Sequence, residues 1–138
     1  LFEVLRGGFN KDHDFRFDIS RTNMNALAAF LNVGLKNYSE LINYETKLPQ
    51  QTPSLANGAT RYDRTCSSCH GETGQKINFG SIGSPVYLGD VATGNPWEFL
   101  HKALYGQPGE SGMPPVSTRG WDDQDLTDLL AHVQSLAD

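Results

Sequence analysis

The stretch Cys66-Ser67-Ser68-Cys69-His70 decides how this chain folds and what it can hold. Two cysteines three positions apart lie on the same face of a helical turn, and a histidine directly follows the second cysteine. Three kinds of site use a Cys-x-x-Cys pair: a redox dithiol, half of a zinc site, and the covalent attachment site of a c-type haem. The rest of the sequence distinguishes between them.

The sequence argues against a zinc site and against a dithiol. The chain has two cysteines in all and its other histidines are scattered, whereas a structural zinc site needs four suitably spaced ligands. A thioredoxin-like pair opens a helix within a βαβ pattern, but this pair ends a helical stretch and precedes glycine-rich sequence. The motif therefore predicts one haem c, bound through Cys66 and Cys69, with His70 as an axial ligand of the iron.

Length and composition bound the class of protein. The 138 residues suffice for one compact domain with an extension. The mean hydropathy is −0.45, and no apolar run approaches the ~20 residues of a membrane span. The net charge of −5 argues against a nucleic-acid partner, because surfaces that bind nucleic acids are basic.

Apolar residues recur every three or four positions in four stretches, and no persistent strand pattern is present. We therefore expect an all-α fold. The clearest helix start is Asn95-Pro96, with Asn as the cap and Pro at the first helical position. Gly34 is a candidate break in the first stretch. The expected helical stretches are Met24–Tyr38, Ser54–Cys69, Asn95–Gly106 and Asp122–Leu136.

Irregular chain is expected between these helices. The stretch Gly71–Gly94 is rich in Gly, Ser and Asn, and wrapping around a haem is one reason for so long a loop. A second loop is expected over Gln107–Gly120. The prolines of Lys47–Pro53 predict a linker. We therefore expect an N-terminal extension with one or two helices over residues 1–50 and a haem domain over residues 51–138.

The second axial position of a haem iron needs a ligand, and Met113 is the strongest candidate. It lies in Ser111-Gly112-Met113-Pro114-Pro115, where a glycine and two prolines make a stiff, irregular loop that can hold one sulfur in place. Ligation by His70 and Met113 fills both axial positions, so it predicts outer-sphere electron transfer and not catalysis. The other candidates are water, His13, and three residues whose neighbours indicate packing or surface roles: Met24, His101 and His132.

Taken in order, these motifs resemble a class I cytochrome c over residues 54–138. Gly58 precedes an aromatic residue, Tyr62, by four positions, as in the first helix of that family. Gly71 follows the attachment motif, and Ser84-Pro85-Val86-Tyr87-Leu88 resembles the Gly-Pro-x-Leu segment of the family. Met113-Pro114 is similar to the loop that carries the distal ligand. One departure is His132, because the family usually has Tyr or Phe there.

The resemblance implies helices packed around a covalently bound haem, and it implies roles for further residues. His70 Nδ1–H would donate to the Pro85 carbonyl and fix the imidazole plane. His132 would pack against the turn of Gly58. Four aromatic residues are expected to wall the haem, with Tyr87 and Trp97 as its main contacts. The other two are Phe79 and Trp121.

The function implied by the resemblance is one-electron transfer to and from redox protein partners, with no enzymatic activity. The alternative is the haem subunit or a fragment of a larger periplasmic dehydrogenase complex of sulfur or respiratory metabolism. A third reading, a haem sensor or peroxidase, needs an open iron position. No signal peptide is visible at Leu1, and haem c is attached outside the cytoplasm in this family. We therefore expect a removed leader or longer precursor and a periplasmic location.

Residues 1–50 contain no haem motif but are rich in phenylalanine near their start. These side chains are expected to pack against the haem domain or to form a homodimer contact. The segment Ala26–Leu31 also resembles the last helix of a cytochrome c domain. Two alternatives follow: a family-specific extension, or the end of a preceding domain in a two-domain bacterial cytochrome c. The phenylalanines are Phe2, Phe9, Phe15 and Phe17.

Overall fold

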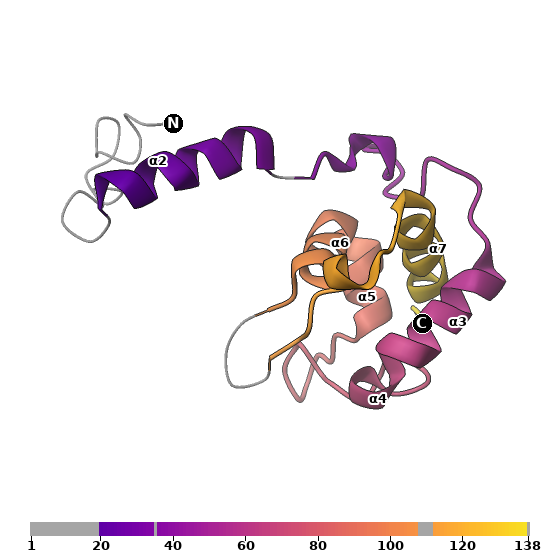
Figure 1. Ribbon diagram of the computed structural model, residues 1–138. Coiled ribbons are helices and arrows are strands. Elements are labelled where there is room, and N and C mark those ends of the chain that lie inside the picture. The colour runs from indigo at the N-terminus through magenta and orange to yellow at the C-terminus, as the bar shows by residue number, and fades with distance from the viewer. Residues whose placement is uncertain (1–19, 35, 108–111, 138) are drawn as a thin grey trace. The chain divides into compact units, whose positions relative to one another are not determined.

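The computed structural model describes residues 20–34, 36–107 and 112–137, and this part of the chain is helical (Figure 1). Short turns of 3-10 helix cover Tyr38–Glu40 and Ser117–Arg119, and a π-helical turn covers Phe30–Gly34. The described residues form isolated bridges but no strand, which confirms the all-α prediction. The α-helices are α2 (Arg21–Ala29), α3 (Leu55–Thr65), α4 (Ser67–His70), α5 (Leu88–Gly94), α6 (Pro96–Tyr105) and α7 (Asp123–Gln134).

The chain divides into two compact units, Leu1–Asn37 and Tyr38–Asp138. Leu41 and Ile42 are completely buried in the core of the second unit. The segment after them is tied down as well, since the Gln50 N–H donates to the Leu41 carbonyl at 2.8 Å. The boundary expected between residues 50 and 51 therefore lies inside this unit, and the proline-containing linker is part of its packed structure.

In the first unit, α2 begins at Ser20, whose hydroxyl accepts a hydrogen bond from the Asn23 N–H at 3.2 Å. Ser20 is therefore the N-cap of α2. Met24 is the buried residue of this helix. The four N-terminal phenylalanines and the homodimer contact expected of them lie outside the described residues. No helix in the described part of the chain is both long and apolar enough to cross a membrane.

Side-chain caps start the helices of the second unit. The Ser54 hydroxyl accepts from the third residue of α3, and the Asn95 side chain accepts from the Glu98 N–H at 3.3 Å, with Pro96 at the first helical position of α6. Asp122 and Asp125 form a reciprocal capping box at α7. The helix starts expected at Asn95 and Asp122 are thus confirmed.

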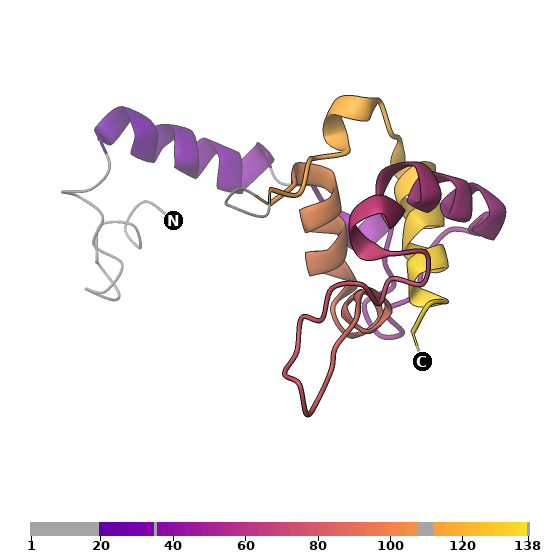
Figure 2. The same cartoon turned by 90° about the horizontal axis from the view of Figure 1, so that it is seen from below.

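One helix is missing from the sequence-based prediction. The stretch expected to be a loop up to Gly94 ends in α5, which begins at Leu88 and buries Leu88, Gly89 and Ala92. Its short length and two glycines give it weak helical propensity, so packing determines its structure. A Cβ at Gly89 would overlap the backbone of Ala137. The rest of the stretch is a loop that projects from the helices (Figure 2).

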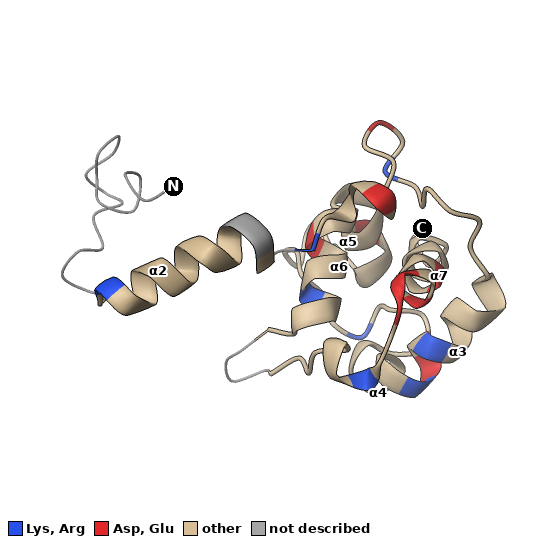
Figure 3. Cartoon of the chain, turned by 45° about the horizontal axis from the view of Figure 1, so that its top comes forward, with Lys and Arg blue, Asp and Glu red and all other residues tan. Residues whose placement is uncertain are grey.

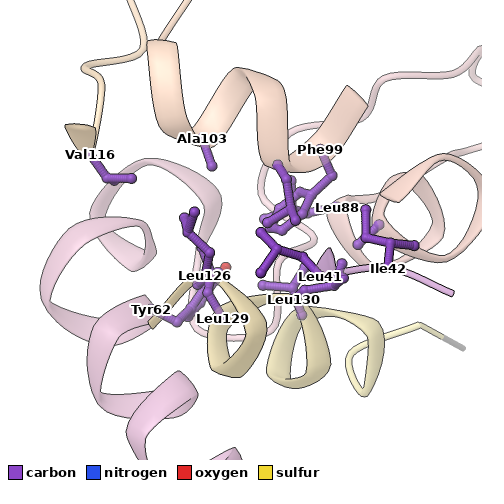
Figure 4. Packing of buried hydrophobic residues seen from close by; sticks show 13 residues of the cluster. Leu41, Ile42, Tyr62, Leu88, Phe99, Ala103, Val116, Leu126, Leu129 and Leu130 are labelled. Carbon is purple, nitrogen blue, oxygen red and sulfur yellow. The ribbon is translucent and has the colours of Figure 1, made fainter. Parts of the chain in front are cut away.

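A single hydrophobic core joins the helices of the second unit. Figure 4 shows side chains of α3, α6 and α7 converging with the segment around Leu41. Leu129 and Leu130 of α7 are fully buried, so α7 supplies the centre of this core. Partly buried aromatic, sulfur-containing and aliphatic side chains pack around it, namely Tyr38, Cys66, Val91, Trp97, Leu104, Met113, Trp121 and Leu136.

The backbones of α3 and α7 approach each other closely at Gly58. A Cβ at this position would overlap the Asp128 carbonyl oxygen and would lie 2.8 Å from the His132 Cβ, so glycine is required here by the approach of the second backbone. The Asp128 carboxylate accepts hydrogen bonds from the Ser54 N–H at 2.7 Å and from the Asn57 amide at 2.8 Å. The start of α3, directly before Gly58, is therefore held against α7.

His132 occupies the place expected for it, against α3. Its ring lies 5.4 Å from the ring of Tyr62, and the side chain is partly buried. Burial holds the pKa of His132 below its ordinary value of 6.5. The neutral imidazole is therefore the form that fits between the two helices.

We expect Gly58→Ala to lower the free energy of unfolding by about 2–3 kcal/mol, because the added methyl must separate α3 from α7. The control is Gly94→Ala, where a Cβ would have no atom within 4 Å. That change should leave stability unaltered or raise it by up to about 1 kcal/mol. Denaturant unfolding followed by circular dichroism measures both. Equal stability of the two variants would show that the close crossing is not required.

The His132 contact predicts a pH dependence. Because the folded pKa lies below the unfolded one, the unfolded chain binds the proton more readily. The free energy of unfolding that the neutral His132 side chain supports is complete above pH 6.5. It is lost as the pH falls through that value toward the folded pKa. When the pH falls from about 7.5 to about 5.5, we expect the His132→Tyr variant to lose less stability than the unsubstituted protein. His101→Tyr, at an exposed position of α6, is the control, and the account fails if both variants behave alike.

Candidate haem site

The Cys-x-x-Cys-His motif forms a helical turn of its own. The helix expected from Ser54 to Cys69 is interrupted at Cys66, where α3 ends and α4 begins. The Cys66 N–H still donates to the Tyr62 carbonyl at 2.7 Å, and the His70 N–H donates to the Cys66 carbonyl at 2.9 Å. Gly71, with a φ of +82°, ends the turn. The motif is thus fixed to the end of α3 at one side and to a glycine turn at the other.

His70 is buried, with 8% of its surface exposed. Its Nδ1 atom is buried without a hydrogen-bond partner among the described residues, so the expected donation to the Pro85 carbonyl is not formed in this structure. Burial also lowers the pKa of the imidazole. The Phe79 ring lies 6.2 Å from it. A neutral imidazole keeps a lone pair on one ring nitrogen and can therefore ligate a metal ion.

Hydrogen bonds hold the turn that follows His70. The Tyr62 hydroxyl donates to the Gly71 carbonyl at 2.6 Å. The Lys76 backbone N–H donates to the His70 carbonyl at 3.0 Å, and its ammonium donates to the Ser68 carbonyl at 2.8 Å. Sequence reasoning recognised Tyr62 as a helix residue but missed that its hydroxyl positions the motif. The polar tip of a tyrosine on an apolar face was the available signal.

The two cysteines are free thiols that differ in their surroundings. Cys66 packs against the hydrophobic core and Cys69 is exposed. Burial raises the pKa of the Cys66 thiol to about 11, although the guanidinium of Arg119 opposes this. Redox-active Cys-x-x-Cys pairs depend on a lowered thiol pKa. The pair is therefore poorly suited to dithiol chemistry.

A zinc site is also poorly supported. In the described residues no three His, Cys, Asp or Glu side chains come together as metal ligands. A structural zinc ion needs four such ligands. The donor set around the motif is instead two thiols and one imidazole, which fits covalent attachment of a haem and one axial ligand to its iron.

Met113 lies on a loop that is tied to the end of α6. Gln107 and Met113 exchange two backbone hydrogen bonds of 3.0 Å each. Gly106 allows the chain to turn back closely, since a Cβ there would overlap the Met113 carbonyl oxygen. Val116 is buried and its N–H donates to the Ala103 carbonyl at 3.0 Å. Met113 is partly buried against the same core cluster as Cys66, so the fold brings both residues to one core.

The remaining sequence-predicted site residues lie in the loop before α5, directly before its first residue, and on α6. Pro85 is exposed and lies three residues before Leu88, one residue farther than in a Pro-x-Leu segment. Tyr87 directly precedes α5, and its N–H donates to the Asp90 carboxylate at 2.7 Å. The Trp97 ring lies 5.6 Å from that of Tyr44. None of these described contacts joins Pro85, Tyr87 or Trp97 to the attachment motif, so their roles at the haem stay predictions.

Comparison with known proteins agrees with this arrangement. The family described as cytochrome c oxidase, cbb3-type, subunit III matches residues 53–133. The match covers more than half of the chain and contains the attachment motif, Met113 and nearly all of α7. Searches of curated proteins and of solved structures returned no significant match. The chain therefore belongs to this c-type cytochrome family, with the class I cytochrome c fold and a role in haem-based electron transfer.

Proposed function

We propose that the protein is a one-electron carrier with a single haem bound covalently through Cys66 and Cys69 and held axially by His70 and Met113. The observation that carries this proposal is the buried imidazole of His70 on a turn that also presents two free thiols. A haem bound there would store one electron by alternating between ferric and ferrous iron.

The residues around the attachment motif favour electron transfer over catalysis at the proposed haem. Tyr62 and Lys76 hold the turn on which His70 lies, so the imidazole is preorganised. The core cluster that contacts Cys66 and Met113 keeps water from that side. Two protein ligands leave no iron position for oxygen or peroxide, which favours electron transfer over catalysis. A thioether ligand also favours the reduced state and raises the potential relative to ligation by two histidines.

The proposed place of action is the periplasm or an equivalent exported space, where haem c is attached. A second candidate function is that of a haem subunit in a larger oxidoreductase complex. It is favoured by the matching family, whose description names an oxidase subunit. In either case the electron leaves for a protein partner, and this chain carries no substrate chemistry of its own.

Substitution of Met113 tests the ligation. The ferric protein should show the weak sulfur-to-iron absorption at the red end of the visible spectrum, and Met113→Leu should abolish it. The variant should also bind carbon monoxide when reduced and should have a lower potential. The control is Met24→Leu at the only other methionine of the chain, which should keep the band. Absence of the band in the unsubstituted protein, or its survival in Met113→Leu, would contradict the proposal.

A further inference from the structure

Lys76 is bound back onto the attachment motif by both its backbone and its side chain. Its backbone N–H donates to the His70 carbonyl at 3.0 Å, and its ammonium donates to the Ser68 carbonyl at 2.8 Å. The carbonyl groups in the last turn of a helix have no partner within that helix. Because α4 is a single turn of four residues, Lys76 supplies hydrogen bonds to two of the carbonyls that this turn leaves open.

The residues between His70 and Lys76 form a compact turn that determines this position. Gly71 and Gly74 have φ values of +82° and +75°, and the Gly74 N–H donates to the Gly71 carbonyl at 3.2 Å. A Cβ at Gly71 would lie 3.1 Å from the Lys76 Cβ, so the two ends of the turn are in contact. The backbone therefore places the Lys76 side chain at the carbonyl end of α4.

The segment that follows Lys76 is held in place as well. The Asn78 side-chain oxygen accepts hydrogen bonds from the Gly80 and Val86 N–H groups at 2.8 and 3.0 Å. The Phe79 N–H donates to the Val86 carbonyl at 2.8 Å. Lys76 thus lies between two hydrogen-bonded turns, and its backbone has a fixed position relative to the motif.

The ammonium of Lys76 brings a permanent positive charge to a turn of two serines, a cysteine and a histidine. Figure 3 shows basic residues on α3, the helix that leads into this turn, and acidic residues at the start of α7. An ion pair of 2.6 Å between Arg61 and Asp125 joins these two helices to each other. The Lys76 ammonium is instead bonded to the motif itself.

We propose that Lys76 is a positioning residue that fixes the attachment turn and, through its charge, favours the reduced state of the proposed redox centre. This inference rests on the proposed function. Ser68 directly precedes Cys69 and lies two residues before His70, so the ammonium is held beside residues proposed to attach the haem and to ligate its iron. Oxidation adds one positive charge at the iron, and a cation held nearby opposes that step. Loss of the charge should therefore lower the potential.

The test is a redox titration of the holoprotein and its Lys76 variants. Lys76→Met removes the charge and the donor, and should shift the ratio of ferrous to ferric protein about threefold toward the ferric form at a fixed applied potential. Lys76→Arg keeps the charge and a donor, so it should restore the ratio. Lys76→Glu reverses the charge and should shift the ratio further, about tenfold. Added salt should reduce both shifts, because Lys76 is exposed.

Lys47→Met is the matched control. The Lys47 ammonium donates to the Gly94 carbonyl at 2.6 Å, so it makes the same kind of contact at the end of another helix, α5. The two Lys→Met variants should lose similar stability, with the equilibrium constant of unfolding raised about threefold in each. Only Lys76→Met should change the potential, because a purely structural role would alter stability and leave the potential as it was.

The contact itself is read from the carbonyl ¹³C resonance of Ser68 in the reduced, isotopically labelled holoprotein. That resonance should move in Lys76→Met and stay close to its original position in Lys76→Arg.

Three outcomes of the titration would overturn the proposal: an unchanged potential in Lys76→Met, an equal change in Lys47→Met, or no restoration by Lys76→Arg. An unmoved Ser68 resonance in Lys76→Met would overturn it as well. In each case the protein still titrates with one electron and keeps its sulfur-to-iron band, so the result is distinct from a failure of the proposed function.

Discussion

The close crossing of α3 and α7 at Gly58 is the constraint on which the rest of the structure depends. Because the two backbones meet there without a side chain between them, Tyr62 is directed into the core. Its hydroxyl then fixes the Gly71 carbonyl, directly after His70. The buried Asp128 strengthens the same crossing. Burial alone would raise its pKa, but hydrogen bonds from Asn57, Ser54 and Gln124 and the charge of Arg61 together hold it below its ordinary value.

The sequence predicts those parts of the fold whose signal lies within a few residues. Examples are the cap at Asn95, the acidic start of α7 and the attachment motif. What could not be predicted depends on distant contacts. The helix α5 has weak propensity and forms because Gly89 packs on the chain near Ala137. Leu41 and Ile42 belong to the core, although the prolines that follow them resemble a linker.

In the candidate site too, local sequence predicts some features and distant contacts determine the others. Cys66, Cys69 and His70 lie on one turn because their spacing requires it. Pro85 could not be placed in this way, because one extra residue before Leu88 shifts the register of the segment and leaves the proline exposed. The imidazole is consequently unpaired at Nδ1. The site thus combines a buried histidine, His70, with two thiols of unequal burial at Cys66 and Cys69.

The most direct test of the account is a redox titration of the purified protein followed by its visible spectrum. The account predicts one reversible transition that fits a one-electron Nernst curve, with the spectral change of a single low-spin c-type haem. A two-electron transition without a haem spectrum would instead identify Cys66 and Cys69 as a dithiol couple. That result would contradict the account.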